Sequence, residues 1–166
     1  GKGITGGRGV CGTVFVHKVA GACAEDGMSL DEVHEAAGRV ADAMGTMGVA
    51  VSPCTLPGAT ATQAAAERLA GRTVEVGMGI HGEPGRETMD IPETQAADTL
   101  ADIMLDAVLG KTTEAAAAGA RLAVSKGDKV ALMVNNLGAT PALELLIVAR
   151  RAAKALEERG LMLARA

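Results

Sequence analysis

Short β-branched segments alternate along this chain with segments of helical periodicity, and this order most constrains the fold. The strongest helical segment follows Ser29, which forms a capping box with Glu32; apolar side chains then recur at three- and four-residue steps to about residue 44. Residues 48–55 and 73–80 are short, contain β-branched side chains and are followed by Pro and Gly clusters, which predicts strands. Strands linked by helices predict an α/β layered domain.

Two further elements are predicted in the second half of the chain, and two segments are ambiguous. Pro92 suits the first turn of a helix that ends at Gly110, and residues 129–134 predict a strand. Residues 9–26 fit a strand by their β-branched content or a buried helix by their length and alanine; we favour the helix. Residues 59–71 combine alanine with flanking proline and glycine, so their conformation stays open.

The last predicted helix has apolar residues on all sides of its first half. Thr140 and Pro141 supply an N-cap and an N1 proline, and the helix ends near Gly160. Residues 142–149 show no polar stripe, which predicts that this half is deeply buried.

The two ends of the sequence predict a piece of a larger protein. Residues 1–8 are glycine-rich and resemble an interdomain linker, and residues 9–166 form one α/β domain. Residues 161–166 begin a further strand in which the chain stops, so we expect this domain to be truncated at its C-terminal end.

Composition argues against several classes of partner. A net charge of -4, with no Trp or Tyr and one Phe, offers neither a positive field nor stacking surfaces for nucleic acid. No apolar stretch is long enough to cross a membrane, and no signal peptide is recognisable. Cys11, Cys23 and Cys54 fit neither a disulfide framework nor a zinc site. We therefore expect a cytoplasmic protein.

His81, in the run GMGIHGEPG at residues 77–85, is the main candidate functional residue. The glycines around it let backbone approach a small ligand closely. A neutral imidazole has an unprotonated nitrogen that can add reversibly to a ketone without a metal. A solvated or core side chain is the usual alternative for a lone histidine. On the residues alone that alternative is the more common case; the resemblance of the surrounding run to a known family is what favours capture of a substrate carbonyl by His81.

Four blocks follow one another along the chain: RGVCGTVFVHKVAGACAEDG (8–27), AMGTMGVAVSPCTLPG (43–58), GMGIHGEPG (77–85) and ALMVNNLGATPALEL (131–145). In this order they resemble the substrate-binding subunit or domain of dihydroxyacetone kinases, in its C-terminal half. The resemblance implies a two-layer α/β domain with a mixed β-sheet packed by helices, the second domain of that module. In the family, the histidine of the G-I-H-G-E-P-G run attacks dihydroxyacetone and holds it as a hemiaminal; by motif this role falls to His81.

The resemblance also implies the reaction and the partners. The chain would be part of a glycerone kinase that holds a short ketose while a terminal hydroxyl is phosphorylated. A second histidine and an aspartate, the acid and base, lie in a preceding domain, so we expect this chain alone to be inactive. No cofactor is expected in this chain: ATP and magnesium, or ADP as a relay from a phosphotransferase system, would be bound by a helical domain or subunit. The family is usually homodimeric.

Three alternative functions are compatible with some of the same features. A regulatory homologue would bind the same ketone without kinase activity, and a kinase could act on another short ketose such as erythrulose. A lipid-binding protein of similar architecture would have no need for His81.

Other polar residues carry weaker expectations. Glu83 could orient the His81 ring, but is more simply a solvated loop charge. His17 and Lys18 are expected as a structural polar pair on a mostly buried helix, and His34 as a solvated side chain.

The segment from Asn135 to Gly138 joins a strand to a helix N-terminus. Such a place often binds ligands, yet Asn and Gly are also what a tight turn needs. Pocket shaping by Asn135, Asn136 and Gly138 and a purely structural turn remain equally open.

Overall fold

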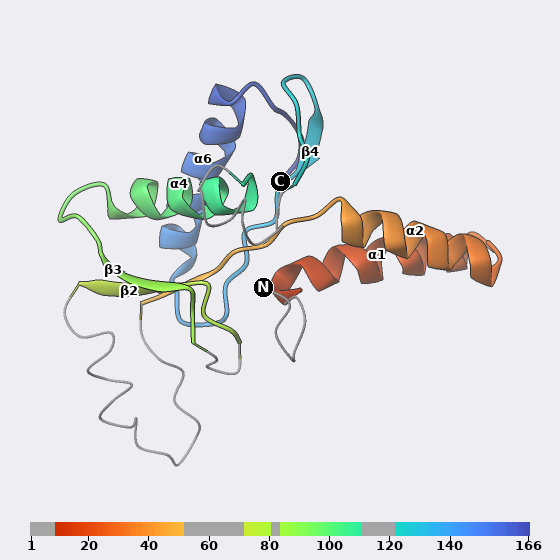
Figure 1. The fold of residues 1–166 in the computed structure, drawn as a ribbon, viewed down its shortest axis with the longest axis horizontal. Coiled ribbons are helices and arrows are strands. Elements are labelled where there is room, and N and C mark those ends of the chain that lie inside the picture. Colours follow the sequence, from red (N-terminus) through yellow and green to blue (C-terminus); the bar gives the residue numbers. More distant parts are fainter. Residues whose placement is uncertain (1–8, 52–71, 81–83, 111–121) are drawn as a thin grey trace, which may run out of the picture. The chain divides into compact units, whose positions relative to one another are not determined.

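A computed structural model describes four stretches of the chain (Figure 1): residues 9–51, 72–80, 84–110 and 122–166. Its internal contacts divide into two compact units, one formed by residues 1–46 with 108–124 and the other by residues 47–107 with 125–166. Helices and short strands are both present, which confirms the predicted α/β class. The described strands form two small sheets, one antiparallel and one parallel. The predicted linker at residues 1–8 lies outside the described residues.

The first unit contains a helical hairpin. A 3-10 turn, η1 (Val10–Gly12), leads into helix α1 (Thr13–Glu25), and α2 (Leu30–Asp42) follows after a short turn. The helix favoured for residues 9–26 is confirmed. It is not mostly buried as predicted: α1 has no buried residue, and Val14 and Val19 are 43% and 38% exposed. Among the described residues, α2 is the main helix that packs against α1, so a large part of the α1 surface is left exposed.

The predicted capping box at the start of α2 is confirmed. The Glu32 backbone N–H donates to Ser29 Oγ at 3.4 Å, and the Ser29 backbone N–H donates to Glu32 Oε2 at 2.8 Å. Ser29 Oγ also donates to Glu32 Oε2 at 2.7 Å. The two bonds that the Glu32 carboxylate accepts lower its pKa; the bond from the Ser29 hydroxyl has the larger effect, and the bond from the Ser29 backbone N–H the smaller. Local sequence alone therefore fixes where this helix begins.

The second unit contains an antiparallel sheet with β2 at its centre. Strand β2 (Thr73–Val76) pairs with β1 (Val49–Ala50) on one side and with β3 (Glu87–Asp90) on the other. Val74 and Val76 are 1% and 0% exposed, so β2 forms the core of the sheet. Both predicted strands occur but are shorter than expected, and residues 52–55 of the first lie outside the described residues. Strand β2 ends at Val76, because the next residue, Gly77, has a φ of 80°, which is incompatible with an extended strand.

Strand β3 was not predicted from the sequence. Its residues are Glu87, Thr88, Met89 and Asp90, and only Met89 is partly buried. A polar strand at the edge of a sheet lacks the apolar alternation that identifies a strand. Its pairing with β2 depends on contacts that a local pattern does not reveal.

Helix α4 (Ala96–Val108) begins later than Pro92, which the sequence placed in its first turn. The Ile91 backbone N–H still donates to the Arg72 carbonyl at 3.1 Å, so the chain at that point is leaving the sheet. Pro92 therefore lies in the connection between sheet and helix, and the position predicted for it was wrong. The predicted helix itself is confirmed.

A strand, a helix and a parallel strand end the chain. Strand β4 (Lys129–Ala131) and strand β5 (Met162–Arg165) pair in parallel, joined by α6 (Ala142–Glu158). All three elements were predicted. Pro141 occupies the N-cap of α6 and not N1, and no side chain caps the helix, so the capping role predicted for Thr140 was wrong.

The burial predicted for the first half of α6 is also wrong. Leu143 and Leu146 are 71% and 65% exposed, whereas the buried residues, Ala152, Ala155 and Leu156, all lie in the second half. Small side chains there allow close approach of a neighbouring helix. Periodicity identified an apolar segment but could not show which half is covered within this chain.

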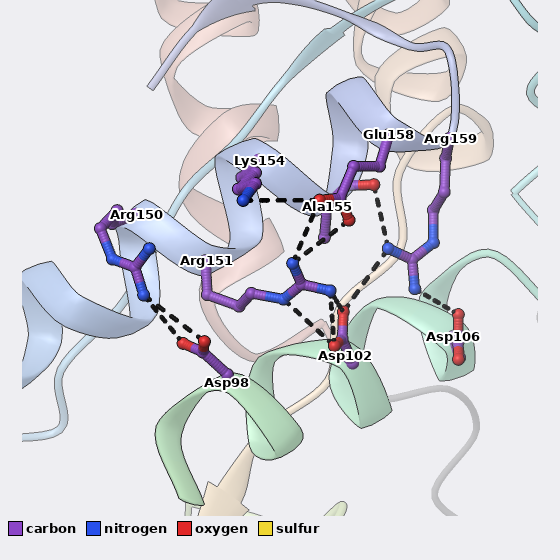
Figure 2. Close-up of polar contacts among 9 residues, drawn as sticks. All are labelled: Asp98, Asp102, Asp106, Arg150, Arg151, Lys154, Ala155, Glu158 and Arg159. Atoms are coloured by element: carbon purple, nitrogen blue, oxygen red, sulfur yellow. Dashed lines mark hydrogen bonds and ion pairs between the residues drawn. The ribbon is translucent and has the colours of Figure 1, made fainter. Parts of the chain in front are cut away.

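Ion pairs join α6 to α4 (Figure 2). Aspartates one turn apart on α4 face two arginines of α6 and Arg159, the C-cap residue of that helix. Arg151 Nη2 donates to Asp102 at 2.8 Å from Oδ2 and 3.0 Å from Oδ1, a contact that raises the Arg151 pKa above its usual value. We call this set the α4–α6 ion-pair ladder: Asp98 with Arg150, Asp102 with Arg151, and Asp106 with Arg159.

Candidate functional site

The candidate site is the connection between β2 and β3, which contains the run GMGIHGEPG. Its centre, His81 with Gly82 and Glu83, lies outside the described residues, so the roles predicted for His81 and Glu83 stay predictions. The two ends of the connection, residues 77–80 and 84–86, are described. Their geometry shows how the loop is attached to the sheet.

Three backbone N–H groups close the base of this loop. Gly77 donates to the Gly48 carbonyl at 2.7 Å, and Arg86 donates to the Val76 carbonyl at 2.7 Å. Gly85 donates to Oε1 of the Glu75 side chain. The loop therefore leaves the sheet at Gly77 and returns to it at Gly85 and Arg86, close to the end of β2. His81 lies in the sequence between these two hydrogen-bonded ends.

Two of the glycines in the run are required by the loop's own backbone. Gly77 has a φ of 80°, a conformation that L side chains rarely adopt. A Cβ atom at Gly85 would lie 2.5 Å from the Val76 carbonyl oxygen, which is closer than such atoms approach. From the sequence, these glycines were expected to allow close approach of a ligand. At Gly77 and Gly85 the structure gives a different reason: each lets the backbone form the base of the loop.

Glu75 is a residue of this site that the sequence reasoning missed. It lies in the middle of β2 and is only 3% exposed. The sequence contained a signal for it: a glutamate between two valines of a predicted strand is unusual, because a buried carboxylate needs a partner. That its partner is Gly85 follows only from the fold.

The Asn-rich segment after β4 forms a self-contained turn. The Asn136 side chain accepts from the Gly138 N–H at 2.8 Å and the Thr140 N–H at 3.3 Å, and donates to the Thr140 carbonyl at 2.6 Å. Gly138 has a φ of 115°. For Asn136 and Gly138 the turn explains both residue types without a ligand.

The histidines and cysteines that the structure describes do not gather into a site. His17 and His34 are both exposed, as expected for His34. Cys11 lies 3.4 Å from Thr46 Oγ1, Cys23 is unpaired, and Cys54 lies outside the described residues. The part of the chain that the structure describes contains no group of three metal-ligating side chains. Among the same residues, no helix is long and apolar enough to cross a membrane.

Comparison with known proteins places the chain in a family. The Dak1 domain model matches residues 2–166. The chain is 43% identical over 162 residues to a triokinase/FMN cyclase of Rattus norvegicus, covering 97% of this chain and 26% of that protein. It is 39% identical over 157 residues to the dihydroxyacetone-binding subunit DhaK of a PTS-dependent dihydroxyacetone kinase of Listeria innocua, covering 94% and 43%.

A solved structure shows the same fold. The dihydroxyacetone kinase of C. freundii, crystallised with AMP-PNP and Mg²⁺, matches with a TM-score of 0.66 and 32% identity, over 93% of this chain and 25% of that one. The chain thus spans about a quarter of the length of that enzyme and of the rat protein. Since the family model covers almost every residue, the chain belongs to the Dak1 domain family.

Proposed function

We propose that this chain is the ketose-capturing half of the substrate-binding module of a dihydroxyacetone kinase. The observation that carries the proposal is the Dak1 match across residues 2–166, which includes the run around His81. The chain corresponds to 43% of the Listeria dihydroxyacetone-binding subunit, which agrees with placement in one half of such a module. We assign it to the C-terminal half, on the resemblance of its four sequence blocks, with residues 9–166 as the α/β domain.

In the proposed reaction His81 binds the ketone covalently. A ring nitrogen forms a bond to the carbonyl carbon, the carbonyl oxygen becomes a hydroxyl, and the imidazole gives up one N–H proton; no group leaves. An alcohol such as glycerol offers no carbonyl and is not held in this way. Capture fixes the terminal hydroxyl for phosphoryl transfer, which depends mainly on positioning. His81 anchors the substrate and does not carry the phosphoryl group.

The phosphoryl donor is proposed to be bound outside these residues. The sequence contains no phosphate-binding loop of the Walker type. ATP with magnesium, or ADP serving as a phosphotransferase relay, would be held by a nucleotide-binding helical domain or subunit of the same kinase. A homodimer and a cytoplasmic location complete the proposal.

The test is ¹³C NMR of the full-length protein with dihydroxyacetone labelled at its carbonyl carbon. We expect the ketone signal to be replaced, on the protein, by a signal typical of a tetrahedral carbon bonded to nitrogen and oxygen. His81→Ala should leave the ketone signal unchanged. A tetrahedral signal of equal intensity in His81→Ala would contradict the assignment, and parallel spectra with labelled erythrulose would show which ketose is preferred.

A further inference from the structure

We infer that Glu75 is a positioning residue that ties the returning end of the His81 loop to strand β2. It lies six residues before His81 in the sequence, and it contacts the loop on the other side, at Gly85. The function proposed above does not depend on Glu75.

The burial of Glu75 needs an explanation. Successive side chains of a strand point to opposite faces, so Glu75 faces away from the side that buries Val74 and Val76. It is nevertheless 3% exposed, as buried as its neighbours. A buried carboxyl group costs free energy unless it is hydrogen-bonded, and an apolar side chain would serve the sheet better.

The contact with Gly85 supplies the explanation. Glu75 Oε1 accepts the hydrogen bond from the Gly85 backbone N–H. A Cβ atom at Gly85 would lie 2.7 Å from Glu75 Cγ and 3.0 Å from the Met78 backbone nitrogen. The returning chain therefore rests directly on the Glu75 side chain and on the first residues of the loop.

This bond is separate from the pairing of the strands. At the opposite end of the β2–β3 pair, Thr73 Oγ1 donates to Asp90 Oδ1 at 2.9 Å, and the four register pairs from Thr73 with Asp90 to Val76 with Glu87 hold the strands together. The Glu75 bond adds nothing to that ladder. It holds the described returning end of the loop, at Gly85, beyond the ladder. Phosphoryl transfer to a captured ketose depends on positioning, so a displaced reacting group would be damaging.

The experiment compares four variants of the full-length protein with the wild type. Glu75→Leu removes the acceptor but keeps a buried side chain of similar size, and Glu75→Gln keeps an acceptor oxygen. Gly85→Ala displaces the other partner, because its Cβ would contact the Val76 carbonyl oxygen at 2.5 Å. Thr73→Val, which removes the exposed bond at the far end of the strand pair, is the matched control.

The expected results separate positioning from stability. In Glu75→Leu the Gly85 amide exchanges with solvent about tenfold faster, as loss of one hydrogen bond implies. The His81 ring signal, assigned by its absence in His81→Ala, shifts, and dihydroxyacetone binds at least about tenfold more weakly at temperatures well below the Tm of the variant, where the variant is folded. Glu75→Gln retains most of the binding, Gly85→Ala loses it, and Thr73→Val resembles the wild type.

Two results would overturn the role of Glu75. The first is that, in Glu75→Leu, neither the hydrogen-exchange rate of the Gly85 amide nor the His81 ring signal changes. The other is wild-type ketone binding in that variant despite faster exchange. The role rests on the proposed function only for the choice of ligand: if the wild type binds no ketone, the proposed function fails, while Gly85 exchange and the His81 signal still decide whether Glu75 positions the loop.

Discussion

Gly77 and Gly38 contribute to stability in opposite ways. Gly77 has a φ of 80°, whereas Gly38 lies inside α2 with open space where a side chain would be. We predict that Gly77→Ala lowers the free energy of unfolding by about 1–2 kcal/mol, the cost of a left-handed alanine. Gly38→Ala should raise it by about 0.5–1 kcal/mol, because alanine favours the helix. Urea unfolding measures both; equal effects would contradict the conformation of Gly77.

Ser29 and Glu32 predict a pH effect at the start of α2. The pKa of Glu32 is lowered, first by the Ser29 hydroxyl and then by the Ser29 backbone N–H. The stability that comes from this contact is therefore present above the usual glutamate pKa and is lost as the pH falls through the lowered value. In Ser29→Ala the Glu32 pKa should rise toward its usual value, as an NMR titration would show.

A control for this titration is Ser29→Thr, which keeps a hydroxyl at the N-cap. The Glu32 pKa should stay low in that variant. A pKa that is the same in Ser29→Ala and in the unaltered protein would show that the hydroxyl is not the main cause. The cap itself is worth about 1 kcal/mol to the helix.

At the scale of elements, the α4–α6 ion-pair ladder predicts unequal effects for two aspartates one turn apart. Asp102 meets Arg151, whose side chain is only 19% exposed, in a two-pronged contact, and it also forms an ion pair with Arg159 at 3.6 Å. Asp98 meets only Arg150 among the described residues, and Arg150 is 61% exposed. Asp102→Asn should lower the free energy of unfolding by about 1–2 kcal/mol.

Asp98→Asn is the matched control on the same helix, since exposed pairs contribute little. Its effect should not exceed about 0.5 kcal/mol. Chemical denaturation of both variants tests the difference. Equal losses would mean that burial of the arginine does not determine the strength of these pairs.

The elements that could be predicted are those with local signals. The capping box, the apolar stripe of α2 and the β-branched run of β4 depend on neighbours in the sequence, and each element occurs. Strand β3 could not be predicted, because its polar residues pair with β2 over a distance in sequence. The exposed first half of α6 was missed for a related reason: composition shows an apolar surface but not what covers it.

The candidate site divides in the same way. The role of His81 is predicted from the resemblance of its run to a family motif, which needs no structure, and it stays a prediction. The bond between Glu75 and Gly85 could not be found, because it joins residues ten positions apart through a loop whose closure is a property of the fold.

For the whole molecule, the main prediction concerns catalysis by the isolated chain. Because the donor site and the acid and base are proposed to lie elsewhere, these 166 residues alone should not phosphorylate dihydroxyacetone with ATP. A coupled assay for ADP release, run beside the full-length protein as positive control, measures this. Turnover by the isolated chain would show that the phosphoryl-transfer machinery is here.

The central claim, covalent capture of a ketone by His81, is tested most directly by native mass spectrometry of the full-length protein with dihydroxyacetone. We predict one adduct per site with the mass of the complete ketone, because hemiaminal formation expels no water, and no such adduct with glycerol. His81→Ala should show no adduct. An adduct of equal abundance in His81→Ala, or one that has lost a water molecule, would contradict the claim.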